Sequence, residues 1–109
     1  MATNCVLVWT TVSSETDSRA LATTLVNDRL AACVNILPEM DSVYRWKGSV
    51  EQDRERQLII KTTADRVPGL SARLRALHSY ELPELIVTSI IDGSEEYLAW
   101  VRESTTKEK

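Results

Sequence analysis

The sequence predicts an α+β sandwich whose elements follow the order strand, helix, two strands, helix, strand and a final helix. Three observations support this class. Apolar runs at residues 5–12 and 85–91 are typical of strands, a period-two alternation covers residues 32–46, and apolar residues at helical spacing occur in the segments between these strands. The chain therefore alternates strand and helix signals along nearly all of its length.

The first strand and helix follow from residues 5–29. Residues 5–12, CVLVWTTV, are apolar or β-branched, which is typical of a central strand covered on at least one face. Ser14, with Asp17 three residues later, has the spacing of a helix N-cap. The helix is expected to continue to about Arg29, because one apolar stripe runs along it: Leu21, Ala22, Leu25 and Val26.

The next element is a strand pair that is too long for the domain that contains it. Residues 32–46 alternate in polarity, and at about 3.3 Å per residue they would span about 50 Å. A chain of about 100 residues has a radius of gyration near 13 Å. The strand must therefore bend or overhang its core, and Pro38, which has no amide hydrogen, marks the bend. Lys47 and Gly48 then form a tight turn.

The return strand, residues 49–63, is polar in its first half and apolar only at Leu58, Ile59 and Ile60. Its polar half is expected to leave the core as part of a two-stranded ribbon, which is marginally stable alone and offers a free edge to another chain. Tyr44 and Trp46 on the apolar face of the ribbon are therefore predicted interface residues of a homo-oligomer. The alternative is a solvated, mobile hairpin.

The second half of the chain predicts a helix, a strand and a last helix. Asp65 is the expected cap of a helix that ends near His78 and has four apolar residues on one face: Val67, Leu70, Leu74 and Leu77. The strand at residues 85–91 follows. Ser94 is the expected cap of the last helix, and three of its residues are predicted to point inward: Tyr97, Leu98 and Val101.

This order matches a ferredoxin-like βαββαβ sandwich with an added C-terminal helix. In that topology, residues 5–12 lie between residues 49–63 and 85–91, and the overlong strand lies at the edge of the sheet. Residues 1–109 are expected to form one domain, because a chain of this length has room for a single core.

Composition excludes several classes of protein. The net charge of -3 and the pI near 5.1 come with both signs interspersed, which is not the pattern of a nucleic-acid binder. No apolar run reaches the length of a membrane span, and the first residues lack the basic region followed by an apolar stretch that is typical of a secretory signal. We therefore expect a cytoplasmic protein in which Cys5 and Cys33 are reduced and mostly buried.

Five motifs occur in the order and at the spacing of a known family: RLAACVNILP, SVYRWKG, LIIKT, HSYELPEL and YLAWV. Together they resemble the CutA family of divalent-ion-tolerance proteins. The resemblance implies a ferredoxin-like protomer in a PII-like homotrimer, with the long hairpin reaching a neighbouring subunit. It also implies a link to copper or other divalent-metal tolerance.

His78 is the only histidine of the chain and the candidate metal ligand. Imidazole binds Cu(II) well, so Cu²⁺ or another divalent metal is the expected cofactor, if there is one. Some proteins of the resembled family carry a cysteine and a second histidine where this chain has Trp9 and Leu77. His78 is therefore the only residue of that ligand set that this chain retains. The alternative is a capping or hydrogen-bonded histidine.

The segment just beyond His78 contributes to a candidate ligand cleft. Tyr80 and Glu84 are expected to face Lys61 or Trp46 of a neighbouring subunit, and such a cleft would hold a small ligand at the subunit boundary. The alternative assigns the aromatic residues to the interface and Glu55, Lys61 and Glu84 to ion pairs. The mixed-sign run EQDRER is expected to form a salt-bridged strand face.

The leading function is a non-enzymatic, trimeric metal-tolerance or ligand-sensing protein. A purely structural or signalling trimer is an alternative. A hydrolase of the acylphosphatase type is a weaker one, because the connection TTVSSE lacks the glycine of a phosphate cradle. An RNA-recognition domain is disfavoured because the chain contains no Phe.

Overall fold

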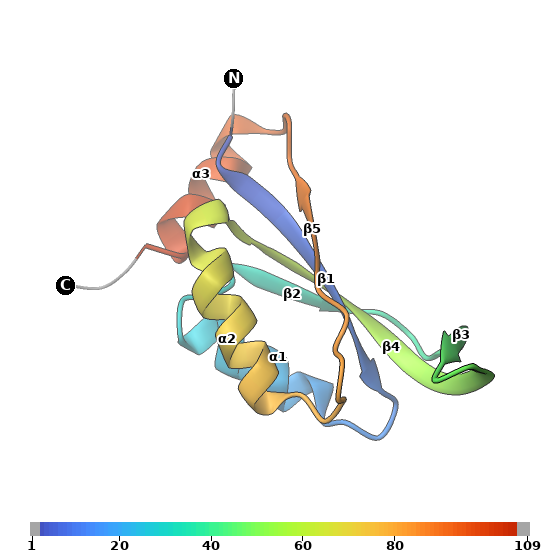
Figure 1. Ribbon diagram of the computed structural model, residues 1–109. Helices are drawn as coiled ribbons and strands as arrows, with labels where there is room; N and C mark the ends of the chain where they lie inside the picture. Colours follow the sequence, from blue (N-terminus) through green and yellow to red (C-terminus); the bar gives the residue numbers. More distant parts are fainter. Residues whose placement is uncertain (1–2, 107–109) are drawn as a thin grey trace.

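The computed structural model describes residues 3–106 and confirms the α+β sandwich. Helices α1 (Ser18–Asn27) and α2 (Val67–Leu77) lie side by side on one face of an antiparallel sheet, and α3 (Glu95–Ser104) packs at the end of the sheet near the start of the chain (Figure 1). The five strands of that sheet are β1 (Cys5–Ser13), β2 (Cys33–Ile36), β3 (Met40–Trp46), β4 (Ser49–Thr63) and β5 (Ile86–Ser89).

The order of the strands is the one that the ferredoxin-like topology predicts. The sheet runs β2, β4, β1, β5, and β3 pairs with the outer half of β4. β1 therefore lies between β4 and β5, and β2 and β3 form the opposite edge. Because β4 separates β1 from β2, Cys5 and Cys33 lie in non-adjacent strands, and both are free thiols, Cys5 buried and Cys33 half-buried.

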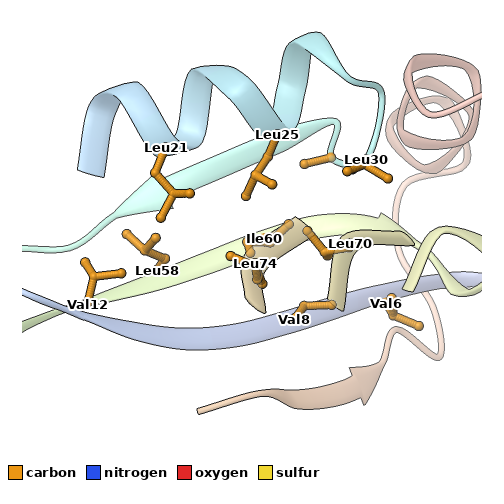
Figure 2. Packing of buried hydrophobic residues seen from close by; sticks show 11 residues of the cluster. Val6, Val8, Val12, Leu21, Leu25, Leu30, Leu58, Ile60, Leu70 and Leu74 are labelled. Atoms are coloured by element: carbon orange, nitrogen blue, oxygen red, sulfur yellow. The ribbon is translucent and has the colours of Figure 1, made fainter. Parts of the chain in front are cut away.

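The core lies between the sheet and the helices α1 and α2, as Figure 2 shows. Val8, Leu58 and Ile60 point from the central strands toward Leu25 and Leu70, and each of these five side chains is completely buried. A second, smaller cluster on the other face of the sheet joins α3 to the start of β1: Cys5, Ala32, Leu98 and Val101. Alternation along the central strands thus buries both faces at this end of the sheet.

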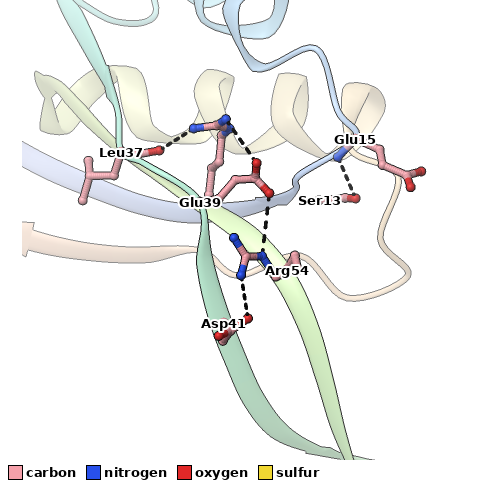
Figure 3. Close-up of polar contacts among 7 residues, drawn as sticks. Ser13, Glu15, Leu37, Glu39, Asp41 and Arg54 are labelled. Carbon is pink, nitrogen blue, oxygen red and sulfur yellow. Dashed lines mark hydrogen bonds and ion pairs between the residues drawn. The ribbon is translucent and has the colours of Figure 1, made fainter.

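The predicted bend at Pro38 is present as a β-bulge. Ile36 pairs with Leu58 and Met40 with Glu55, so three residues of the edge, 37–39, stand opposite two residues of β4. Arg56 donates a hydrogen bond to the Leu37 carbonyl over 3.2 Å. Arg54 lies between Glu39 and Asp41 on the same side of the ribbon, and Figure 3 shows these contacts.

Beyond the bulge, β3 and the first half of β4 form the predicted overhanging ribbon (Figure 1). The first six residues of β4 are exposed, and burial begins at Glu55. The chain is elongated as a result, with a long axis of 44 Å and a radius of gyration of 14.7 Å. Lys47 and Gly48 close the hairpin with φ values of 49° and 84°, and two positive φ values are characteristic of a type I′ turn.

Two predicted helix caps are wrong. Asp17, not Ser14, caps α1, because its carboxylate accepts a hydrogen bond from the Ala20 amide over 3.0 Å. α1 also ends at Asn27, before Arg29, whose φ of 59° lies in the left-handed region. Asp65 lies in a short 3-10 turn (Ala64–Arg66) ahead of α2, and its side chain caps nothing there.

The last strand is shorter and more exposed than its composition suggests. β5 has four residues, and all of them are exposed; β1 is its one strand partner within the described residues. Leu77 and Tyr97, which were expected to point inward, are 42% and 43% exposed. The Ser94 cap is confirmed, since its hydroxyl accepts a hydrogen bond from the Tyr97 amide.

Candidate functional site

An open cleft of about 770 Å³ lies between the ribbon and residues 79–86. Because Leu58 and Ile60 point toward the helices, the odd-numbered residues of β4 point to the opposite face, where the cleft lies. The β3 residues across from them contribute its second wall. The side chains that carry its chemistry are Tyr44, Trp46, Glu55, Gln57, Tyr80 and Glu84.

The ribbon separates its charges by face. The strand pairing places Glu51, Asp53 and Glu55 on the cleft face of the ribbon. It places Arg54 and Arg56 on the opposite face. The mixed-sign run EQDRER therefore becomes an acidic face toward the cleft and a basic face away from it. The ion pairs of Arg54 and Arg56 with Glu39 and Asp41 lie on the basic face.

Glu55 is the buried charge of the cleft. It is 8% exposed, and the Tyr80 hydroxyl donates a hydrogen bond to its Oε2 over 2.6 Å. Burial and this bond, together with the negative charge of Glu55, raise the pKa of Tyr80 above its ordinary value of 10.0. Tyr80 therefore stays protonated and serves as a hydrogen-bond donor throughout the physiological range.

Tyr44 and Trp46 line the ribbon side of the cleft. The Tyr44 hydroxyl donates to Asp53 on the facing strand, and this bond and the negative charge of Asp53 raise the pKa of Tyr44 to about 12. Lys47 at the turn lies with its Nζ 5.6 Å from the centre of the Trp46 ring and 3.7 Å from the carboxylate of Glu81. The tip of the ribbon is thus linked to the segment that follows α2.

Gln57 positions Glu84 in the wall of the cleft that faces the ribbon. Its side-chain nitrogen donates to the Thr10 carbonyl over 2.8 Å and to Glu84 over 2.9 Å. The Gln57 amide therefore holds the Glu84 carboxylate against the sheet. Gln57 lies two residues after Glu55 on β4, and both side chains point to the cleft face. Two carboxylates consequently converge on the inner end of the cleft.

His78 follows α2 and both of its ring nitrogens are engaged. Nε2 lies 2.7 Å from the Thr11 carbonyl, and Nδ1 accepts a hydrogen bond from the Tyr80 amide over 3.1 Å. Since a carbonyl only accepts and a backbone amide only donates, the proton of the neutral ring is on Nε2. His78 therefore connects the end of α2 to β1 and orients Tyr80, whose ring centre lies 4.7 Å from its own.

The sequence profile of one protein family, described as the CutA1 divalent ion tolerance protein, matches residues 6–104. This chain belongs to the CutA1 family. The divalent-cation tolerance protein CutA of Thermus thermophilus is 48% identical over 99 residues, which cover 91% of this chain and 96% of that protein. Protein CutA of Homo sapiens is 41% identical over 95 residues, and the match covers 87% of this chain but 53% of the human protein.

Solved CutA1 structures share the fold over nearly the whole chain. The Thermus thermophilus structure superposes with a TM-score of 0.90 at 47% identity and covers 94% of this chain and 99% of its own. The Oryza sativa structure gives a TM-score of 0.90 at 38% identity and covers 95% of both chains. These similarities confirm the predicted family and the predicted fold class.

The family description raises the question whether one CutA1 protomer fits a divalent metal. No group of three His, Cys, Asp or Glu side chains within residues 3–106 is arranged to hold one. The neutral ring of His78 has one lone pair, on Nδ1, and the Tyr80 amide already uses it. The described residues of a single protomer therefore do not form a metal site by themselves.

The structure brings together most of the predicted cleft residues, but within one chain. Trp46, Tyr80 and Glu84 line the same cavity, whereas Lys61 lies further along β4, with its Nζ 5.7 Å from the Tyr97 ring centre. Glu55 and Gln57 were not predicted to line the cleft. The period-two alternation of EQDRERQ could have placed both on the face of Tyr44 and Trp46, had its charges been sorted by parity.

Proposed function

We propose that this CutA1 protein is a homotrimeric, non-enzymatic protein of divalent-cation tolerance, and that its acidic, aromatic cleft binds a small ligand at the subunit boundary. The observation that supports the proposal is the convergence of Glu55, Tyr80 and Trp46 on one cavity. Its volume of about 770 Å³ falls in the range of ligand pockets, which is roughly 300–1,000 Å³. The ribbon that forms one wall of the cleft is also the part of the chain that a neighbouring subunit is expected to cover.

The exposed apolar surface of the ribbon supports assembly. Val43 and Val50 are each 67% exposed on the face of the ribbon opposite the cleft, where water would cover them in a monomer. β3 pairs only with β4, and β5 pairs only with β1, so each has a free edge within the described residues. Unprotected edges and apolar patches of this kind are typical of surfaces that a further chain covers.

The mass of the protein in solution tests the assembly. We expect a trimer, and we expect deletion of residues 44–45 together with their partners 50–51 to abolish it, while keeping the strand register and the Lys47-Gly48 turn. A point variant, Val43→Glu, should also weaken the trimer. Val26→Glu, a substitution at an exposed valine of α1, is the matched control. A stable trimer after the deletion excludes the ribbon as the contact.

Binding of copper or another divalent cation at His78 is the second candidate, and the family description favours it. Such binding requires the Nδ1 bond to the Tyr80 amide to open and other ligands to come from a neighbouring subunit. We expect Cu²⁺ to bind the wild type more tightly than His78→Ala, and to increase hydrogen exchange of the Tyr80 amide. Equal affinity of the two proteins excludes a His78 site.

The free thiols Cys5 and Cys33 support a reducing compartment, and we propose the cytoplasm. Within residues 3–106, no helix has the length and apolar character that a membrane crossing requires. Fractionation of cells that express the tagged protein tests this location. Recovery in a membrane or organelle fraction would contradict it.

A further inference from the structure

The cleft has an excess of negative charge, and the described residues of one chain neutralise only part of it. Glu55, Glu81 and Glu84 are the charged residues that line it, and all three are acidic. Glu81 pairs with Lys47 over 3.7 Å, and both of these side chains are largely exposed. Neither Glu55 nor Glu84 forms an ion pair in the part of the chain that the structure describes.

Burial makes the charge of Glu55 costly. Removal of a carboxylate from water is unfavourable unless a cation or several donors replace the water. Glu55 is only 8% exposed, and among residues 3–106 its one side-chain donor is Tyr80, because the neighbouring arginines Arg54 and Arg56 point to the other face of the strand. A ligand that carries a positive charge would complete its environment.

The aromatic walls select the kind of cation. Tyr44, Trp46 and Tyr80 line the cavity, and the faces of such rings attract ammonium groups by about 0.5–2 kcal/mol each. Lys47 already illustrates the chemistry, since its ammonium lies over the Trp46 ring and beside Glu81. A cavity of about 770 Å³ is far larger than a bare metal ion requires, and it has room for an organic group.

We propose that the cleft binds a small organic ammonium ion, with its charged nitrogen at Glu55 and Glu84 and its carbon groups against the aromatic rings that line the cavity. This assignment rests on the proposed function, because it names the ligand class of the same cleft. It predicts selectivity by charge rather than by shape. Small, fully hydrated cations gain less binding free energy from the aromatic rings than alkylated ammonium ions do.

Choline is a suitable probe, because two analogues of similar shape differ in charge. One is the neutral alcohol in which a tert-butyl group replaces the trimethylammonium group, and the other is the anion isethionate. Binding to the intact oligomer is followed by calorimetry and by the nuclear magnetic resonance signals of the Trp46 indole and the Gln57 side-chain amide. We expect choline to bind at least about tenfold more tightly than the neutral analogue, a difference of about 1.4 kcal/mol.

Variants assign the effect to the cleft. Glu55→Gln keeps an acceptor for Tyr80 and removes the charge, so we expect choline affinity to fall about tenfold, by about 1.4 kcal/mol. Glu103→Gln, an exposed carboxylate on α3, is the matched control and should change nothing. Because the analogue comparison uses the wild type, an unstable Glu55→Gln variant does not prevent the test.

The outcomes separate this inference from the proposed function. Equal affinity for choline and its neutral analogue overturns the ammonium assignment, as does unchanged choline binding by Glu55→Gln. If isethionate or the neutral analogue shifts the Trp46 and Gln57 signals and choline does not, the cleft remains a ligand site and only its ligand class is wrong. If none of the three probes binds, the ammonium assignment is overturned and the cleft loses its support as a ligand site.

Discussion

The Tyr80 hydroxyl donates a hydrogen bond to the Glu55 carboxylate over 2.6 Å and thereby joins residues 79–86 to the overhanging ribbon. These residues are 25 positions apart in the sequence. The bond fixes one wall of the cleft against the other at the point where the charge is most buried. It is therefore a stabilising contact as well as part of the candidate site.

Tyr80→Phe should destabilise the protein by about 1–3 kcal/mol, because it leaves a buried carboxylate without its hydroxyl donor. Urea unfolding at fixed protein concentration measures the change, since the stability of an oligomer depends on concentration. Tyr97→Phe removes a hydroxyl from a side chain that is 43% exposed and serves as the control. Equal stability of Tyr80→Phe and wild type would show that the bond contributes nothing net.

Thr10→Val should stabilise the protein by about 1 kcal/mol. The Thr10 hydroxyl is completely buried and has no hydrogen-bond partner within the described residues, and valine has nearly the same shape without the polar group. Thermal unfolding measures the shift.

Thr62→Val is the matched control for Thr10→Val, and the opposite sign is expected. Thr62 is equally buried, but its hydroxyl donates to the Leu30 carbonyl over 2.7 Å, so its loss leaves a buried acceptor unpaired. We expect a loss of about 1–2 kcal/mol. If both variants shift stability in the same direction, hydrogen bonding is not the cause.

Asp17→Ala should destabilise α1 by about 1 kcal/mol, whereas Ser14→Ala should change stability by less than about 0.5 kcal/mol. The reason is that the Asp17 carboxylate accepts the Ala20 amide bond, while Ser14 lies four residues before the helix begins. Denaturant titration of the two variants compares them directly. A larger effect of Ser14→Ala would restore the cap that the sequence pattern favours.

The stability of the ribbon should decrease at high pH. The folded state raises the pKa of Tyr44 from 10.0 to about 12, mainly through the hydrogen bond to Asp53, so folding favours the protonated phenol. This contribution is complete below pH 10 and is lost as the pH rises toward 12. The absorbance of tyrosinate follows the ionisation, and Tyr44→Phe identifies its step.

Asp53→Asn tests the cause of the Tyr44 shift. It removes both the charged acceptor and the nearby negative charge, so the pKa of Tyr44 should move back toward 10.0. Glu103→Gln removes a carboxylate from the distant α3 and should leave the titration unchanged. An unchanged Tyr44 titration in Asp53→Asn would contradict the assigned cause.

Local patterns predicted much of the fold correctly. The turn residues Lys47 and Gly48 gave the start of β4, its apolar residues 58–60 gave the half that belongs to the core, and the missing amide hydrogen of Pro38 gave the position of the bulge. The strand order followed from the match of the element order to the ferredoxin-like topology. The caps of α1 and α2 were less predictable, because several polar residues near each helix start can serve as a cap.

The site was predicted only in part. Tyr80, Trp46 and Glu84 were expected to meet across two subunits, and the tertiary structure brings them together in one. Lys61 was expected to face Tyr80 and Glu84 across a subunit boundary, and within one chain its Nζ lies beside the Tyr97 ring. Glu55 was interpreted as one charge in a mixed-sign run. Its alternation with Arg54 and Arg56 already indicated that the acidic and basic side chains point to opposite faces of the strand.

The sequence by itself determined which residues form strands, where the long edge bends and which residues turn, because these features depend on neighbours within a few positions. Only the tertiary structure decided that Tyr80 reaches Glu55 and that His78 binds Thr11 and Tyr80. The bonds of Tyr80 to Glu55 and of His78 to Thr11 join segments 25 and 67 residues apart. Their partners follow from how the bulge bends the ribbon and how α2 packs on the sheet, and no local pattern contains that information.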